Sequence, residues 1–223
     1  MERNYASGRG SSCDVCIAGP GDYVVSDNRL IGGGIPGIII LPAVVLSVPA
    51  SIEQYTLPEA ATVTALVRNN EVRGHVRKPV GVGLRVAAVG VGAQTVAGTA
   101  RVTLADNDLI GNTFGIIVEA AFLSQTDPTR RRGDIELTTT GNRISGSCQH
   151  DVLVAMSNSQ TALGIQNGAY LINSTYTLSL GPDIPWSNVW YAHAAGTGNT
   201  LTVNGQAQPN GIVHAYDPTR SCA

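Results

Sequence analysis

Apolar and polar residues alternate along three stretches of the chain, which is the period of a β-strand with one buried face. Turn-forming segments rich in Asn and Gly follow these stretches, and apolar triplets come after the turns. The alternating stretches are residues 62–67, 101–104 and 134–138, and the triplets are 38–40, 84–86, 116–118 and 152–154. The pattern predicts a strand, a turn at Asn, a short strand and a triplet strand, repeated along the chain.

A five-residue pattern marks each predicted turn: Asn, any residue, an aliphatic residue, any residue and Gly. Four copies begin at Asn28, Asn70, Asn107 and Asn142. A weaker fifth copy is predicted at Asn173, and a terminal remnant at Asn199. The first four asparagines lie 42, 37 and 35 residues apart. This spacing exceeds a bare solenoid coil, so each coil is expected to carry an inserted loop.

A single repeat of this kind cannot bury its inward side chains, whereas stacked repeats bury a continuous core. We therefore predict an all-β fold, a right-handed parallel β-helix (solenoid) of about five coils with inserted loops. The β-helix is expected over 22–180, after an irregular N-terminal segment or partial cap at 1–21 and before a C-terminal cap or terminal coil at 181–223. The alternative is a sandwich or jelly roll in which the pattern only marks β-turns.

The four asparagines are predicted to occupy equivalent turn positions and to bond to one another as a structural ladder. In the triplets, the first and third residues should face the core and the middle residue should face outward. The middle residues are Ile39, Arg85, Ile117 and Leu153. Because three of them are large and aliphatic, we expect a cover over this stripe, from the same chain or from a second copy in a homodimer.

The repeats resemble those of the pectate-lyase-like superfamily of parallel β-helix proteins, over roughly residues 22–180. The resemblance implies the fold without specifying an activity, because that superfamily includes polysaccharide lyases and hydrolases, epimerases, phage tailspikes and noncatalytic surface proteins. Complete members usually carry an amphipathic helix that caps the first coil, and no helical pattern precedes the first repeat here. A chain cut from a larger protein would explain this departure.

Charged residues make up only 13% of the chain and the net charge is −2, so no basic field attracts nucleic acid. No run of about 18 apolar residues predicts a membrane span, and no signal-peptide pattern is found. The expected setting is extracellular or at the cell surface after processing.

The four cysteines are Cys13, Cys16, Cys148 and Cys222. The first two form a C-x-x-C, which we interpret as a local disulfide or as free thiols. A zinc site needs a second such pair or a histidine pair, and thioredoxin-type catalysis needs a βαβ context, so neither a metal nor a cofactor is predicted. A calcium ion at Asp27 and Asp106 is the alternative to turn-stabilising bonds from these two side chains.

Acidic and basic side chains near the predicted turns are the candidates for chemistry. A polysaccharide lyase needs a base and cations, and a glycosidase needs paired carboxylates. The catalytic candidates are Glu71, Asp106, Asp108 and Arg143. Three of them, together with Arg29, directly follow a ladder asparagine and would form one outward column if the coils stack in register. That column is either a catalytic row or a solvated row of weak ion pairs.

Two further groups are candidates for ligand binding. Trp186, Trp190 and Tyr191 form the only aromatic cluster, which is either a C-terminal cap or a platform for stacking sugars. Arg130, Arg131 and Arg132 follow a predicted turn and would suit an acidic polymer, although short runs of arginine are usually only solvated. The segments between the coils, at 41–62, 87–100, 121–134, 155–170 and 181–198, are expected to form loops or short third strands near one side of the solenoid, where a ligand would bind.

The main functional hypothesis is a noncatalytic β-helix module that acts as a surface or contacts carbohydrate, with a polysaccharide, a second copy or the rest of a larger chain as partner. The alternative is a polysaccharide lyase or glycoside hydrolase acting on a polymer bound along the solenoid. This alternative depends only on the activities of other members of the superfamily. A groove in which two carboxylates and an arginine converge would favour the enzyme.

Overall fold

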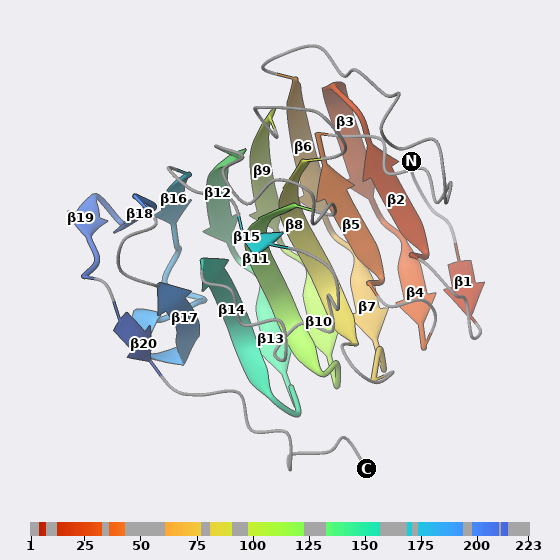
Figure 1. Ribbon diagram of the computed structural model, residues 1–223. Coiled ribbons are helices and arrows are strands. Elements are labelled where there is room, and N and C mark those ends of the chain that lie inside the picture. The colour runs from red at the N-terminus through yellow and green to blue at the C-terminus, as the bar shows by residue number, and fades with distance from the viewer. Residues whose placement is uncertain are drawn as a thin grey trace.

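The structure is a computed structural model, and it describes residues 5–7, 13–32, 36–42, 61–76, 81–90, 98–122, 133–156, 169–170, 174–193, 198–209 and 211–213. Most of these residues lie in β-strands, and the one helix among them is the 3₁₀ helix η2 (Trp186–Asn188) (Figure 1). The predicted all-β class is confirmed. Within the described ranges, no helix has the length and apolar character needed to cross a membrane.

The strands form three sheets, which we name A, B and C. Sheet A contains β3 (Gly21–Ser26), β6 (Thr62–Arg68), β9 (Gly98–Ala105), β12 (Gly133–Thr140), β16 (Thr175–Ser179) and β18 (Thr200–Val203). Sheet B contains β1 (Tyr5–Ser7), β4 (Arg29–Ile31), β7 (Glu71–Arg73), β10 (Asp108–Ile110) and β13 (Arg143–Ser145). Sheet C contains β2 (Val15–Ala18), β5 (Ile38–Leu41), β8 (Val82–Gly90), β11 (Phe114–Phe122), β14 (His150–Met156) and β17 (Val189–His193).

All of these strands pair in parallel within their sheets, and three short strands pair antiparallel. β19 (Gln206–Ala207) pairs with β18 in sheet A, whereas β15 (Ala169–Tyr170) and β20 (Gly211–Val213) pair with β11 and β17 in sheet C. Figure 1 shows the parallel strands of each sheet side by side, in the order of the chain. An antiparallel strand at the end of a parallel sheet blunts the edge against further pairing.

The chain visits the three sheets in rotation. From β3 to β14 it passes through sheets A, B and C in turn, and we name one such passage a coil. Each strand pairs with the strand of the same sheet one coil later, so that Leu30 is opposite Val72 and Leu109 is opposite Ile144. Residues that are equivalent in the sequence repeat therefore become neighbours in space.

Strand pairing continues on both sides of residues 22–180. Residues 1–21, for which we predict an irregular segment or partial cap, contain β1 and β2, which pair with β4 and β5. The pentapeptide from Asn4 to Gly8 resembles the repeat, but Ala6 stands where the other copies have a larger aliphatic residue. Beyond residue 180, β17 and β18 continue sheets C and A.

The core lies between the inner faces of the three sheets. One hydrophobic cluster contains Val102 from sheet A, Leu109 from sheet B and Val118 from sheet C. Alternation along each strand selects the buried side chains: in β12, Ile135 and Leu137 are buried whereas Glu136 and Thr138 are exposed. The predicted inward residues of the triplets are all fully buried, namely Ile38, Ile40, Leu84, Val86, Ile116, Val118, Val152 and Val154.

The outer side of sheet C is also covered. Ile117 and Leu153, which we predict to face outward, are only 1% and 4% exposed, and Ile39 is half-buried. This burial arises within a single chain, as expected for a cover from the same molecule. The central parts of four inter-coil segments where we predict a ligand to bind (41–62, 87–100, 121–134 and 155–170) lie outside the described residues, whereas the fifth, 181–198, contains η2 and β17.

The predicted asparagine ladder occupies the turns between sheets A and B. The side-chain Nδ2 of one asparagine donates to the Oδ1 of the next, at 2.8 Å from Asn28 to Asn70 and at 2.9 Å from Asn70 to Asn107 and from Asn107 to Asn142. The backbone N–H of each of the first three donates to the same Oδ1, at 3.1–3.2 Å. All four asparagines are at most 5% exposed.

The ladder asparagines also donate hydrogen bonds to backbone carbonyls at the ends of the sheet A strands. Asn107 Nδ2 donates to the carbonyl oxygen of Val67 in the preceding coil, at 2.9 Å. Each amide thus satisfies polar groups in two neighbouring coils, which is the requirement for burying it. The ladder ends at Asp183, whose Oδ2 accepts the backbone N–H of Asn142 at 2.9 Å.

The two weaker copies of the repeat do not extend the described ladder. Asn173 lies outside the described residues. The prediction of a terminal remnant at Asn199 is wrong, because Asn199 lies at the start of β18 in sheet A and its Oδ1 accepts the backbone N–H of Ser174 at 2.8 Å. The alternating residues after Asn199 belong to β18, a strand of sheet A, which the pentapeptide alone does not distinguish from a turn.

A column of glycines precedes the sheet C triplets because neighbouring coils approach closely there. A Cβ on Gly83 would lie 2.9 Å from the carbonyl oxygen of Gly115, and a Cβ on Gly115 would lie 2.6 Å from the carbonyl oxygen of Asp151. Neither glycine has a positive φ, so lack of space and not backbone conformation excludes a side chain. Asp151 occupies the same position in β14 and ends the column.

We expect Asn107→Leu to lower the free energy of unfolding by about 1–3 kcal/mol, because it leaves buried partners on both neighbouring coils unpaired. Chemical denaturation of the purified chain measures this change. Gln206→Leu is the matched control: it also replaces an amide by an isobutyl group, but on an exposed strand, and it should change stability by less than about 0.5 kcal/mol. Equal effects of the two substitutions would contradict a buried ladder.

We expect Gly83→Ala to destabilise the chain by about 1–3 kcal/mol, because the new methyl group meets the Gly115 carbonyl and the buried Asn112 side chain. Asp151→Ala gives alanine at the equivalent position without adding an atom, because Asp151 already carries a Cβ, and should have little effect. Thermal unfolding of both variants compares them. A Gly83→Ala variant as stable as the parent would show that the coils are further apart than described.

Candidate functional site

The predicted column of charged residues exists on the outer side of sheet B. Arg29, Glu71, Asp108 and Arg143 are paired in register along β4, β7, β10 and β13. The next residue of each strand points inward, and Leu30, Val72 and Leu109 are buried there. The tight turn at the ladder places each charged side chain directly after a buried asparagine, so one outward column follows from the repeat itself.

The charges in this column neutralise one another. Arg29 Nε lies 3.0 Å from Glu71 Oε2, Arg73 Nε lies 2.7 Å from Glu71 Oε1, and Arg143 Nη2 lies 2.6 Å from Asp108 Oδ2. The side chains are between 28% and 68% exposed. Ion pairs in such surroundings usually contribute about 0.2–1 kcal/mol or less. Three of the four catalytic candidates are thus brought into one column, where Asp108 pairs with Arg143 and Glu71 pairs with Arg29 and Arg73.

Asp106, the fourth catalytic candidate, is a turn residue outside that column. It precedes Asn107 and has a φ of 54°, and the equivalent residues Asp27, Asn69 and Gly141 have φ of 58°, 54° and 66°. Every coil therefore uses a left-handed residue before its ladder asparagine. Asp, Asn and Gly tolerate this conformation better than other residues do, which accounts for the aspartates at this position.

Asp27 and Asp106 are also the residues of the calcium hypothesis. Both occupy the left-handed position before a ladder asparagine, which explains their presence without a metal ion. Their backbone N–H groups donate to Arg68 and Thr140 carbonyl oxygens, at 3.2 and 3.0 Å. Among the described residues, no group of three or more His, Cys, Asp or Glu side chains could hold a metal ion.

Two aromatic candidates stack on each other at the C-terminal end of the core. The rings of Trp186 and Tyr191 are 5.4 Å apart at an interplanar angle of 21°. Tyr191 is 6% exposed and Trp186 packs against the core cluster, so these rings offer little surface to a sugar and cover the last coils instead. Nothing is described of the Trp190 side chain, and Arg130, Arg131 and Arg132 lie outside the described residues.

A buried ion pair on the outer side of sheet C escaped the sequence analysis. Arg85 in β8 directs both Nε and Nη2 at Oε1 of Glu119 in β11, and Glu119 is fully buried. The other carboxylate oxygen, Oε2, makes no hydrogen bond. Burying such a pair is costly unless each polar atom is satisfied. The available signal was Arg85 itself, the one charged residue in the column of aliphatic middle residues.

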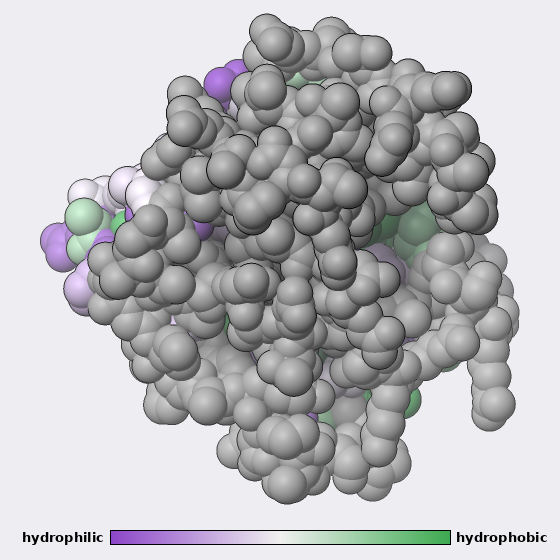
Figure 2. Space-filling view, in the orientation of Figure 1, coloured by the Kyte–Doolittle hydropathy of each residue, from purple (hydrophilic) through white to green (hydrophobic). Residues whose placement is uncertain are grey.

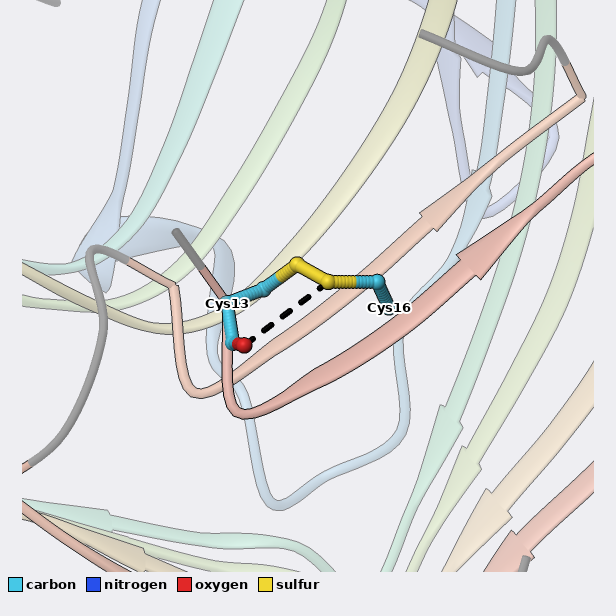
Figure 3. Close-up of a disulfide and its surroundings, with 2 residues drawn as sticks. All are labelled: Cys13 and Cys16. Atoms are coloured by element: carbon cyan, nitrogen blue, oxygen red, sulfur yellow. Dashed lines mark hydrogen bonds between the residues drawn. A yellow bond between two sulfur atoms is a disulfide. The ribbon is translucent and has the colours of Figure 1, made fainter. Parts of the chain in front are cut away.

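A disulfide and a histidine lie where sheet C begins. Cys13 and Cys16 are joined at the start of β2 (Figure 3), so the C-x-x-C is a local disulfide. Cys148 is also disulfide-bonded, and Cys222 lies outside the described residues. Asp14 Oδ2, inside the disulfide loop, is 3.5 Å from Nε2 of the fully buried His75. His75 Nε2 and Asp14 Oδ2 thus link the first coil to the turn that follows β7.

The outer side of sheet A, which the sequence analysis did not single out, presents the longest described polar surface. Its central row takes one side chain from each of six neighbouring strands: Asp22, Thr64, Arg101, Glu136, Thr177 and Thr202. All but the last are exposed. In the middle of the row, Arg101 Nε donates to Glu136 Oε2 at 3.0 Å, and both side chains are about half exposed.

Hydroxyl groups flank the central row on both sides. One flanking row contains Thr62, Thr99, Asp134, Thr175 and Thr200. The other contains Val24, Leu66, Thr103, Thr138 and Ser179. Figure 2 shows hydrophilic and near-neutral residues, in purple and white, at the end of the stack that carries β18 and β19. The sheet A outer face can therefore donate and accept hydrogen bonds in a regular array.

Comparison with protein-family models, with curated proteins and with solved structures finds no match to this chain. The residues themselves therefore carry the functional argument.

We expect Asp106→Asn to leave the free energy of unfolding within about 0.5 kcal/mol of the parent, because Asn69 already fills the equivalent position in another coil. Asp106→Val should destabilise by about 1–2 kcal/mol, since a β-branched residue strains the left-handed turn. Urea denaturation separates the two outcomes. Similar losses of stability in both variants would mean that the Asp106 carboxylate, and not its left-handed backbone conformation, is what the fold requires at this position.

Proposed function

We propose that this chain is a noncatalytic surface module that contacts carbohydrate. The observation that carries the proposal is the sheet A outer face, with its aligned hydroxyl and charged side chains on successive strands. Such groups suit sugars, whose hydroxyls also both donate and accept hydrogen bonds. The ion pairing of Glu71 with Arg29 and Arg73 and of Asp108 with Arg143 supports a noncatalytic role, because a general acid or base must be available to a substrate proton.

The scaffold that we propose for this module is a right-handed parallel β-helix of about five coils, similar to the pectate-lyase-like superfamily. Three features support it: the rotation through three parallel sheets, the in-register pairing of successive coils and the asparagine ladder. Crossovers between parallel strands of one sheet are right-handed in nearly all proteins. In such a scaffold the outer faces are rigid and continuous, which suits contact with a polymer.

We further propose an extracellular or cell-surface location. The disulfide between Cys13 and Cys16 and the disulfide bonding of Cys148 support it. Structural disulfides persist mainly in oxidising compartments, and polysaccharide surfaces are found there as well.

The proposed function is tested by incubating the purified chain with a panel of plant, fungal and bacterial polysaccharides. Binding is measured by cosedimentation and on a glycan array, and cleavage is measured by the release of reducing ends and of unsaturated products. We expect binding to at least one polysaccharide without cleavage. Cleavage of any polymer would contradict the noncatalytic role, and the absence of binding across the panel would contradict carbohydrate contact.

A polysaccharide lyase or glycoside hydrolase is the second candidate, and the Arg85–Glu119 pair is the observation that favours it. Glu119 keeps one carboxylate oxygen free of hydrogen bonds next to an arginine, as in many acid–base sites, but it is fully buried, so a substrate would have to displace its cover to reach it. If cleavage is detected, Glu119→Gln should abolish it, whereas Asp108→Asn should leave it unchanged. Cleavage that survives Glu119→Gln would exclude this pair as its source.

A further inference from the structure

We propose that the carbohydrate is a neutral, extended polysaccharide that lies across the strands of sheet A, along the central row of Asp22, Thr64, Arg101, Glu136, Thr177 and Thr202. This inference rests on the proposed function and adds the row of side chains that makes the contact, the direction of the polymer and its charge class.

The three outer faces of the stack differ, and only one is suited to such a ligand. On sheet C, Ile117, Leu153 and Glu119 are buried within the chain. On sheet B, the strands are three residues long and their charged column is paired with itself. On sheet A, the described outward residues are mainly exposed and polar. Of these faces, the sheet A outer face presents the largest set of groups for a bound molecule.

The register of sheet A indicates the direction of the polymer. Neighbouring parallel strands are about 4.8 Å apart, so the central row offers one polar side chain at each step over roughly 24 Å. A sugar unit in an extended β-linked chain has nearly the same length. A polymer that runs along the stack therefore meets an equivalent set of groups at each sugar, whereas a polymer that runs along one strand would leave the sheet within a few residues.

The side chains of this face indicate a ligand without charge. The described charged residues on it are Arg68, Arg101, Asp22, Asp134 and Glu136, which sum to −1 at neutral pH. An acidic polymer would be repelled weakly, and a strongly basic one would be attracted only weakly. Threonine hydroxyls bond sugar hydroxyls in either direction, and the half-exposed Arg101 and Glu136 offer planar donors and acceptors to neighbouring hydroxyls.

The rigidity of the sheet also favours binding. The strands that carry Thr64, Arg101, Glu136 and Thr177 are each paired on both sides, so these side chains stand on a backbone that is already ordered. Binding then requires little ordering of the protein, which improves affinity for a given number of contacts. Next to the central row, the aliphatic side chains of Val24 and Leu66 can contact the C–H groups of sugar rings.

The test compares a triple variant, Thr64→Val with Thr177→Val and Thr202→Val, with the parent chain. Valine keeps the shape and strand preference of threonine and removes only the hydroxyls. Matched controls are Asp108→Asn, which removes a charge from sheet B, and a triple threonine-to-serine variant, which keeps the hydroxyls. Circular dichroism and thermal unfolding verify that each variant is folded. Calorimetry measures binding to cello-, xylo- and manno-oligosaccharides of increasing length and to polygalacturonate.

We expect the parent to bind at least one neutral series, with affinity rising until the oligosaccharide spans the row and with little dependence on salt. The triple valine variant should bind at least about tenfold more weakly, which corresponds to about 1.4 kcal/mol. The serine variant and Asp108→Asn should bind like the parent. Weaker binding in the valine variant alone would show that the hydroxyl groups make the contact, and that substitution in general does not weaken binding.

Three other results would overturn the inference. If a neutral polysaccharide binds the parent and the valine variant equally, the face is wrong although the proposed function stands. If polygalacturonate binds instead, in a salt-dependent manner, the charge class is wrong. If no polysaccharide binds the parent, both this inference and the proposed function fail.

Discussion

The structure depends on one constraint: neighbouring coils must lie in register so that their buried turn amides satisfy each other. Asn107 Oδ1 accepts two hydrogen bonds from Asn70, and Asn107 Nδ2 donates to Asn142 and to the Val67 carbonyl. A shift of one residue would leave these buried groups unpaired and would turn the apolar faces of the strands outward. The left-handed residue before each asparagine and the glycine column before each sheet C triplet serve the same close stacking.

Register has a second consequence, because it arranges outward side chains into rows. Parallel strands that pair without offset place equivalent positions of the sequence repeat next to one another on the surface. On sheet B this produces a self-neutralising column, on sheet C a buried aliphatic stripe with one ion pair, and on sheet A rows of hydroxyls. The functional proposals therefore concern the one outer face whose described groups are neither buried nor mainly paired with each other.

Much of this arrangement could be predicted from the sequence, since the repeat specifies which residues are equivalent. The asparagine ladder, the inward triplet residues and the sheet B column follow from it. The role of Asp106 stayed open between a turn residue, a calcium ligand and a catalytic acid, because an aspartate in a left-handed turn looks the same in sequence as a catalytic one. The Arg85–Glu119 pair joins two positions that are offset along neighbouring strands, which the repeat alone does not align. The threonines of sheet A lie far apart in the sequence, and only the pairing of strands shows them as rows.

The most direct test of in-register stacking is residue-resolved amide hydrogen exchange measured by NMR. The backbone N–H groups of Asn70 and Asn107 lie in turns, yet each donates to the side chain of the next asparagine in the ladder. In-register stacking predicts that both exchange as slowly as the amides within β9, because they open only when the coils separate. Exchange as fast as that of an exposed turn, such as Gly205, would contradict the ladder and the register that depends on it.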